Sequence, residues 1–194
     1  MPVRLDTGER RRPAITSGPP EAIPAAVLVL IVPDRSEPDG DPAPDADAEV
    51  VLIERAPHGR HPGEISLPGG RAEDGEEAEA TALREAQEEV GLDTEAAAVR
   101  VVGGLEAFWI PVSGYRVRPV VAIAQRRPAL QASPDEVAAI IHAPLAAFLP
   151  GATIEIVETT IRDIPIRYGA YPVRGHLVWG ATARILGQLG ALLG

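Results

Sequence analysis

One stretch, Gly69–Leu92, constrains the fold more than any other part of the chain. It begins with two glycines after a proline, passes through an acidic turn and continues with the composition of a helix. Asp74 followed by Glu77 three residues later has the spacing of a capping box, which predicts that the helix begins after Asp74. Gly91 follows the last predicted turn, at a position where a glycine cap is common. The stretch therefore predicts a glycine loop leading into a helix that ends at Gly91.

The predicted helix has an apolar face and an acidic face. Its apolar stripe contains Leu83, Ala86 and Val90. At about 100° per residue, Glu85, Glu88 and Glu89 spread over the opposite face. Arg84 lies four residues before Glu88 and can pair with it. Because carboxylates at this spacing repel one another and cost helix stability, a cation is expected beside them.

A hard divalent cation suits such a face. Mg²⁺ and Mn²⁺ prefer carboxylate oxygens and usually keep waters and substrate phosphates as their other ligands. A solvated acidic surface is the alternative, and the three glutamates alone do not decide between the two interpretations.

The spacing around the glutamates resembles the signature of the Nudix hydrolases, G-x5-E-x7-R-E-U-x-E-E-x-G-U, in which U is an aliphatic residue. Every fixed position is filled between Gly70 and Leu92, with Ala86 as the first aliphatic position. The resemblance implies an α/β fold, the Nudix fold, in which a mixed β-sheet is sandwiched between α-helices. It also implies a pyrophosphohydrolase that uses Mg²⁺ or Mn²⁺.

The same resemblance implies a role for each residue of the box. The implied metal ligands are three side chains and one backbone carbonyl: Glu85, Glu88, Glu89 and Gly69. Alternatively, Glu85 deprotonates or orients the attacking water instead of binding the metal, a role whose assignment varies across the family. Together, Glu85, Glu88 and Arg84 form the expected catalytic group, in which Arg84 holds the glutamates in place. Glu76 is expected to be mainly structural, as a partner of Arg84.

A further catalytic candidate lies outside the box. In Nudix enzymes a glutamate elsewhere in the chain often acts as a base or as an additional ligand, and Glu136 is the candidate here. The segment from Ser133 to Glu136 also predicts the start of a second helix, with a serine cap, proline at the first position and glutamate at the third. Completing this capping box is the alternative role for Glu136.

Two segments resemble the coenzyme A pyrophosphatases in particular. They are His61-x-Gly63-Glu64-Ile65-x-x-Pro68-Gly69-Gly70 and Trp179-Gly180-Ala181-Thr182-Ala183. The resemblance implies cleavage of coenzyme A or its derivatives to 4′-phosphopantetheine and 3′,5′-ADP. The candidate substrate-binding residues are Arg55, His61, Gly69 and Gly70. We assign His58 to the exposed surface of the loop.

Other substrates stay open, because the chain departs from this subgroup at several positions. Ala56-Pro57-His58-Gly59 replaces the usual residues after Arg55, and Leu67 stands where phenylalanine is common. The alternatives are ADP-ribose, NADH or an oxidised nucleoside triphosphate. A nucleotide-sensing Nudix module without catalysis is another alternative, which the complete set of box glutamates disfavours.

The remaining sequence predicts one domain over residues 22–194, preceded by an irregular arm over residues 1–21. Residues 33–48 are rich in proline and aspartate and predict a disordered acidic loop. The predicted strands are Ala25–Val32, Glu49–Arg55, Val99–Glu106, Phe108–Val112, Arg116–Ala124 and Ile154–Ile161. The first two are expected to pair across the acidic loop. A C-terminal helix is predicted over Ala181–Leu193.

Composition limits the partners and the compartment. A net charge of −10 argues against a large nucleic-acid interface. The absence of cysteine excludes disulfides and zinc–thiolate sites. The apolar run Ala22–Val32 is too short to span a bilayer. We expect a cytoplasmic enzyme with a small nucleotide substrate and no membrane partner, and a homodimer stays open.

Overall fold

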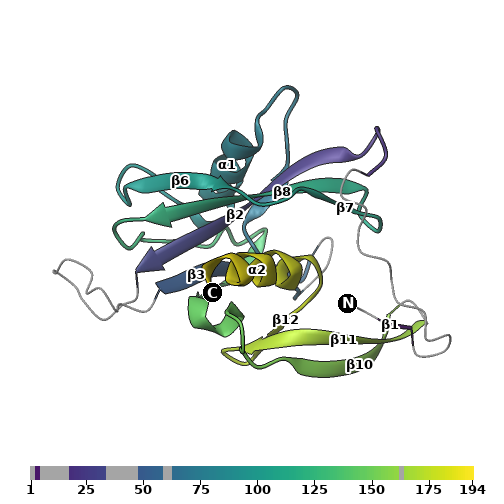
Figure 1. The fold of residues 1–194 in the computed structure, drawn as a ribbon. Helices are drawn as coiled ribbons and strands as arrows, with labels where there is room; N and C mark the ends of the chain where they lie inside the picture. Colours follow the sequence, from purple (N-terminus) through teal and green to yellow (C-terminus); the bar gives the residue numbers. More distant parts are fainter. Residues whose placement is uncertain (1–2, 5–17, 34–47, 59–62, 162–163) are drawn as a thin grey trace.

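The fold is described by a computed structural model, which covers residues 3–4, 18–33, 48–58, 63–161 and 164–194 (Figure 1). The helices are α1 (Ala78–Val90), α2 (Gly180–Leu193) and the short 3-10 helix η1 (Leu145–Phe148). The strands are β1 (Val3–Arg4), β2 (Ile23–Pro33), β3 (Ala48–Arg55), β4 (Ile65–Ser66), β5 (Gly69–Arg71), β6 (Val99–Gly104), β7 (Phe108–Ile110), β8 (Tyr115–Ala124), β9 (Val137–Pro144), β10 (Glu155–Ile161), β11 (Ile164–Val173) and β12 (His176–Val178).

The larger sheet is mixed and centres on β2. Its strand order is β4-β3-β2-β8-β6, with β5 also on β2, β7 on β8 and β9 on β3. Strands β2 and β8 run parallel from the pair Ile23–Tyr115 to the pair Ile31–Ile123, and the other pairs are antiparallel. A strand buried on both faces reads as a continuous apolar run, which accounts for the sequence of β2.

Each face of this sheet is covered by a helix (Figure 1). On one face, Ala82, Ala86 and Val90 of α1 pack against β2 residues that include Leu28 and Leu30. On the other face, Ile185, Leu186 and Leu189 of α2 pack against the sheet and against strands β11 and β12. The predicted α/β fold, a mixed sheet sandwiched between helices, is confirmed.

A smaller sheet has the order β1-β11-β10, with β12 also on β11. It is tied to the larger sheet by Glu49, whose side chain is only 5% exposed. The Glu49 carboxylate accepts hydrogen bonds from Arg127 and from Arg174, both at 2.8 Å. Arg174 lies between β11 and β12, and Glu49 lies at the start of β3. The ion pair of Glu49 with Arg174 therefore joins the two sheets, and Arg127, which follows β8, braces Glu49 from within the larger sheet.

Glu49→Gln is expected to lower the free energy of unfolding by about 1–3 kcal/mol, because the arginines lose a charged acceptor. Glu158→Gln is the matched control. Glu158 pairs with Arg167, and both side chains are 52% exposed, so its loss is expected to cost at most about 1 kcal/mol. Denaturant unfolding of both variants measures the difference. Equal losses in the two variants would contradict the anchoring role of Glu49.

The predicted capping box of α1 is wrong. The helix begins at Ala78 with Glu77 as its N-cap, and no side chain bonds the cap. Glu76 instead braces the turn before the helix, because its carboxylate accepts hydrogen bonds from the Glu73 amide and from the Thr81 hydroxyl, both at 2.9 Å. The predicted C-terminus is confirmed, since Gly91 is left-handed with φ 64°.

The helix predicted from Ser133 is also wrong. The Ser133 carbonyl accepts hydrogen bonds from the amides of Glu136 and Val137, which closes one turn. The chain then continues as β9, which pairs along the whole of β3. Strands β11 and β12 were not predicted. The predicted pairing of β2 with β3 is confirmed near Ile31 and Val50.

Most of the predicted arm, 1–21, and of the predicted acidic loop, 33–48, lies outside the described residues. Within the arm, Val3–Arg4 pairs with β11. In the part of the chain that the structure describes, no helix is long and apolar enough to cross a membrane.

Candidate active site

Arg84 of α1 organises the acidic face of the helix. Its Nε donates to Glu76 Oε1 at 2.9 Å, and its Nη1 donates to Glu88 Oε2 at 2.9 Å. The same Nη1 lies 3.0 Å from Glu85 Oε1, and Nη2 donates to the Arg71 carbonyl at 3.0 Å. One guanidinium therefore fixes three carboxylates and the end of β5, which limits the repulsion between the glutamates.

Two glycines let β5 lie between β2 and α1. The Gly69 amide donates to Glu89 Oε2 at 2.8 Å. Gly69 has φ +150°, and a Cβ there would lie 2.3 Å from the Ala26 carbonyl oxygen. A Cβ at Gly70 would lie 2.5 Å from the Glu85 carboxylate. Both positions therefore require glycine, one for the backbone conformation and contact and the other for Glu85.

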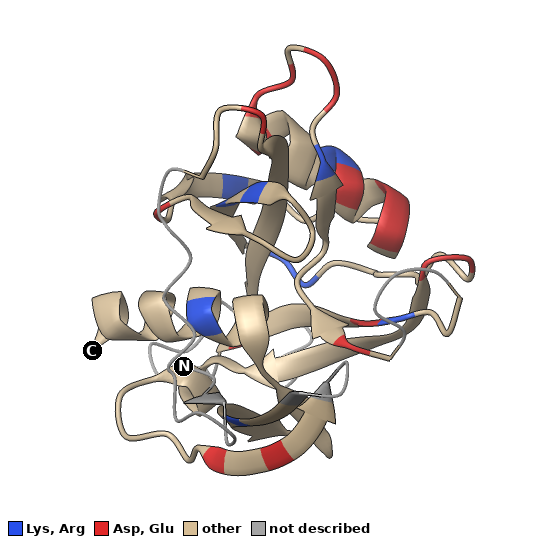
Figure 2. Ribbon diagram, turned by 90° about the vertical axis from the view of Figure 1, so that its right-hand side faces the viewer, with Lys and Arg blue, Asp and Glu red and all other residues tan. Residues whose placement is uncertain are grey.

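A pocket of about 340 Å³ opens beside these glycines. Its acidic lining residues are Glu85, Glu89, Asp135 and Glu136. Its basic lining residues are Arg55, His58 and Arg71. Figure 2 shows acidic positions gathered along α1, next to basic positions. The pocket thus combines carboxylate oxygens with arginines, an arrangement suited to a cation bound together with an anionic ligand.

The structure brings most of the predicted site residues to this pocket. Glu85, Glu89, Glu136, Arg55, Gly69 and Gly70 all line it. Glu88 does not line the pocket, because its side chain is 56% exposed and pairs with Arg84. Arg84 pairs with the carboxylates but does not line the pocket, and His61 lies outside the described residues.

Sequence reasoning missed three polar residues of the pocket, His58, Arg71 and Asp135, as well as Ala56. His58 was assigned to the exposed surface of the loop, and the structure places it both exposed and in the lining. Asp135 directly precedes the candidate Glu136, and Arg71 directly follows Gly70. Their position next to predicted site residues was the one signal in the sequence that could have identified them. Their side chains, however, are equally typical of an exposed turn.

Burial sets the electrostatics of the pocket. Burial raises the pKa of Glu89 to about 7, against the opposing effects of the Gly69 amide and Arg55. Burial also raises the pKa of Glu85, and repulsion from Glu88 and Glu136 adds to this. Hydrogen bonds from Arg84 and from the Glu73 amide lower the pKa of Glu76 to about 2. The carboxylates in the pocket are therefore the ones that gain most from a cation.

Without metal, the protein is expected to lose stability as the pH rises from about 4.5 to about 7. The folded state binds the proton of Glu89 more tightly than the unfolded state does. This contribution is therefore fully present below pH 4.5 and is lost as the pH passes the folded pKa. At 1.36 kcal/mol per pKa unit, the loss approaches about 3 kcal/mol. Denaturant unfolding in the presence of a chelator, repeated across this pH range for wild type and for Glu89→Gln, measures the loss. A difference in the free energy of unfolding between the two proteins that does not change with pH would contradict the prediction.

The donor atoms fit Mg²⁺ or Mn²⁺ in part. Glu85 and Glu89 offer carboxylate oxygens one helical turn apart on the pocket wall, and Gly69 offers a carbonyl beside them. Within the described ranges, no three carboxylate or imidazole side chains converge closely enough to hold an ion. An ion here would complete its shell with waters and substrate phosphate, as Mg²⁺ commonly does.

Comparisons with known proteins agree with this geometry. The NUDIX domain family profile matches residues 24–155. The chain is 36% identical over 186 residues to the Nudix hydrolase NudL of Salmonella heidelberg strain SL476, across 94% of this chain and 89% of the relative. It is 35% identical over 185 residues to NudL of Shigella flexneri, with the same two coverages.

Among solved structures, the Nudix hydrolase RenU of M. smegmatis has a TM-score of 0.59 to this chain at 20% identity. The likeness spans 98% of this chain and 92% of RenU, and it bears on the fold alone. Members of the matched family generally use divalent metals such as Mg²⁺ or Mn²⁺. The chain belongs to the Nudix hydrolase family and is an enzyme that hydrolyses the diphosphate linkage of nucleoside diphosphate derivatives.

Proposed function

We propose that the enzyme cleaves the diphosphate of coenzyme A or its derivatives, releasing 4′-phosphopantetheine and 3′,5′-ADP. The observation that carries the proposal is the pocket in which Glu85, Glu89 and Glu136 face Arg55 and Arg71. The carboxylates would bind the metal that assists the reaction at the diphosphate, and the arginines would bind the phosphates of the substrate.

Glu85, Glu89 and the Gly69 carbonyl would hold Mg²⁺ or Mn²⁺, with Glu88 as the further ligand implied by the Nudix signature. When bound, the metal would neutralise charge on the diphosphate oxygens. In the alternative role of Glu85, the metal would be held by the other ligands, and the Glu85 carboxylate would accept the proton of the attacking water. Burial raises the pKa of Glu85, which makes its carboxylate a stronger base than that of an ordinary glutamate.

The remaining residues position these groups. Arg84 holds Glu85 and Glu88 through its ion pairs. Glu136 lines the same pocket from the turn before β9 and would orient the water or add a ligand. Arg55 would bind a substrate phosphate from the end of β3. The predicted His61 contact with substrate remains part of the proposal.

The two segments that resemble coenzyme A pyrophosphatases lie in contact. The Thr182 hydroxyl, in the C-terminal segment, donates to the Ile65 carbonyl at 3.1 Å in a buried setting. Ile65 belongs to the segment that precedes the glycines. The amide of Arg55 donates to the Glu64 carbonyl, so the same segment is tied to the pocket wall. This linkage supports a role for both segments in shaping one substrate site.

A substrate panel tests the proposal. The protein is incubated with Mg²⁺ and coenzyme A, ADP-ribose or NADH, and the products are identified by mass spectrometry. The expected result is release of 3′,5′-ADP from coenzyme A, with little turnover of the other two. Addition of a chelator should abolish it, and Glu89→Gln serves as the control for contaminating activity. Preferred cleavage of ADP-ribose or NADH would replace coenzyme A with the alternative substrate.

A further inference from the structure

A second hollow, of about 210 Å³, lies on the α1 side of the larger sheet. Its lining is mostly small and apolar: Pro24, Ala25, Ala72, Ala78 and Ala107. Its charged lining residues are Arg116 and Arg118 of β8 and Glu76 from the turn before α1. It shares no lining residue with the pocket beside the glycines. The active site therefore does not account for this hollow.

The two arginines lie close together, and among the residues that the structure describes neither has an acidic partner. Arg116 and Arg118 are two residues apart on one strand, so both side chains point to the same face of the sheet. Both are exposed, and within the described ranges no carboxylate lies within ion-pair distance of either. Arg118 donates a 3.4 Å hydrogen bond to the Leu105 carbonyl.

Glu76, which shares the hollow, does not neutralise these arginines. Its two carboxylate oxygens accept hydrogen bonds from Arg84, from the Glu73 amide and from the Thr81 hydroxyl. The charge of Glu76 is thus offset by Arg84. The hollow keeps the positive charge of its two arginines above a floor of alanine methyl groups.

We propose that this hollow binds a phosphate-bearing small molecule that has a compact apolar part. Guanidinium groups match the geometry of phosphate oxygens, and two of them within reach of one hollow can hold a single phosphate between them. The alanines and Pro24 offer an apolar surface for the rest of the ligand. An anion between Arg116 and Arg118 would also relieve the repulsion between like charges on adjacent positions of one strand face.

Phenyl phosphate tests the proposal, because it combines one phosphate with one apolar ring. It is titrated into the protein in the presence of a chelator, and amide shifts are followed by two-dimensional NMR. The chelator leaves the carboxylates of the catalytic pocket without metal, which disfavours anions there. The expected result is saturable shifts at Ala72, Ala78 and Ala107. Phenol, which lacks the phosphate, should give none.

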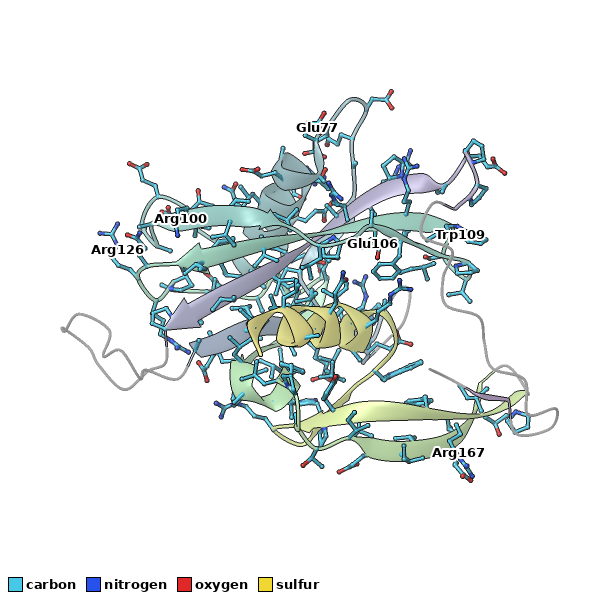
Figure 3. The ribbon with its side chains drawn as sticks, in the orientation of Figure 1. Glu77, Arg100, Glu106, Trp109, Arg126 and Arg167 are labelled. Atoms are coloured by element: carbon cyan, nitrogen blue, oxygen red, sulfur yellow. The ribbon has the colours of Figure 1, made fainter. Side chains whose placement is uncertain are left out.

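Arginine variants identify the contacts. Arg116→Gln and Arg118→Gln are each expected to weaken binding about tenfold or more, the usual effect of losing a charged hydrogen bond. Arg100→Gln is the matched control, since Arg100 is an exposed arginine on β6, toward the end of the sheet where Arg126 lies (Figure 3). It should leave the affinity within twofold of wild type.

Two results would overturn the proposal. One is the absence of shifts at Ala72, Ala78 and Ala107 at about 10 mM phenyl phosphate, a concentration that would nearly saturate a site with a Kd of about 1 mM. The other is unchanged affinity in the Arg116→Gln/Arg118→Gln double variant. The dispersion of the same spectra reports whether each variant is folded, and Arg118→Lys, which keeps the charge but loses the fork, should weaken binding less than Arg118→Gln.

Discussion

Glu89→Gln is expected to lower kcat by at least a hundredfold while the protein remains folded. Glu89 is 3% exposed, faces the pocket and bonds the Gly69 amide at 2.8 Å. Glutamine keeps an oxygen that accepts this hydrogen bond but removes the negative charge that would bind the metal. Loss of one preorganised electrostatic contact in an active site commonly costs about a hundredfold to a thousandfold in rate. Steady-state kinetics at saturating Mg²⁺ measure the effect.

Glu79→Gln is the matched control for this variant. Glu79 is an exposed glutamate in the first turn of the same helix and does not line the pocket. It should leave kcat within twofold of wild type. Because the neutral side chain suits the buried position, Glu89→Gln should also unfold at a higher denaturant concentration than metal-free wild type at pH 8. A variant that keeps wild-type turnover would remove Glu89 from the catalytic machinery.

The helix with the acidic face and the central strand β2 were predictable because local pattern and tertiary environment agree there. The apolar stripe of α1 becomes buried against β2, and the continuous apolar run of β2 is buried on both faces. The glutamates follow from the helical period alone. In these segments the local sequence pattern and the tertiary environment favour the same structure, so sequence reasoning sufficed.

The segment after Ser133 shows where such reasoning fails. Its capping residues make the turn they favour, because Glu136 and Val137 donate to the Ser133 carbonyl. The next residues then pair with β3, where hydrogen bonds along the strand outweigh a local preference for helix. The same turn carries Asp135 and Glu136 into the pocket. A wrong element was therefore predicted around a residue that the structure places beside the box glutamates.

Pairings between distant segments were beyond the sequence. Periodicity does not specify that β8 pairs in parallel with β2, or that Thr182 reaches Ile65 across more than half of the chain. Neither does it distinguish Glu88 from Glu85 and Glu89 on the acidic face of α1. The distinction comes from β5, which covers one side of that face and leaves Glu88 at the edge with Arg84.

Gly70→Ala is expected to lower kcat about a hundredfold, with a much smaller effect on stability. The added Cβ would lie 2.5 Å from the carboxylate carbon of Glu85 and as close to its oxygens, so the carboxylate must move. A displacement of about 1 Å in an active site can cost about a hundredfold in rate. The backbone of Gly70 does not have the positive φ that strains alanine, so the substitution acts on Glu85 rather than on the strand.

Gly169→Ala is the control, because its added Cβ would meet only the side chain of Ile154, which is 54% exposed and free to move aside. It should leave kcat unchanged. If Gly70→Ala acts through Glu85, its effect and that of Glu85→Gln must be non-additive: in the Glu85→Gln background the alanine should cost less than threefold. A double-mutant cycle on kcat measures this coupling. Full additivity would mean that Gly70 serves the substrate directly, as the space for a phosphate beside β5, and that Glu85 is positioned independently of it.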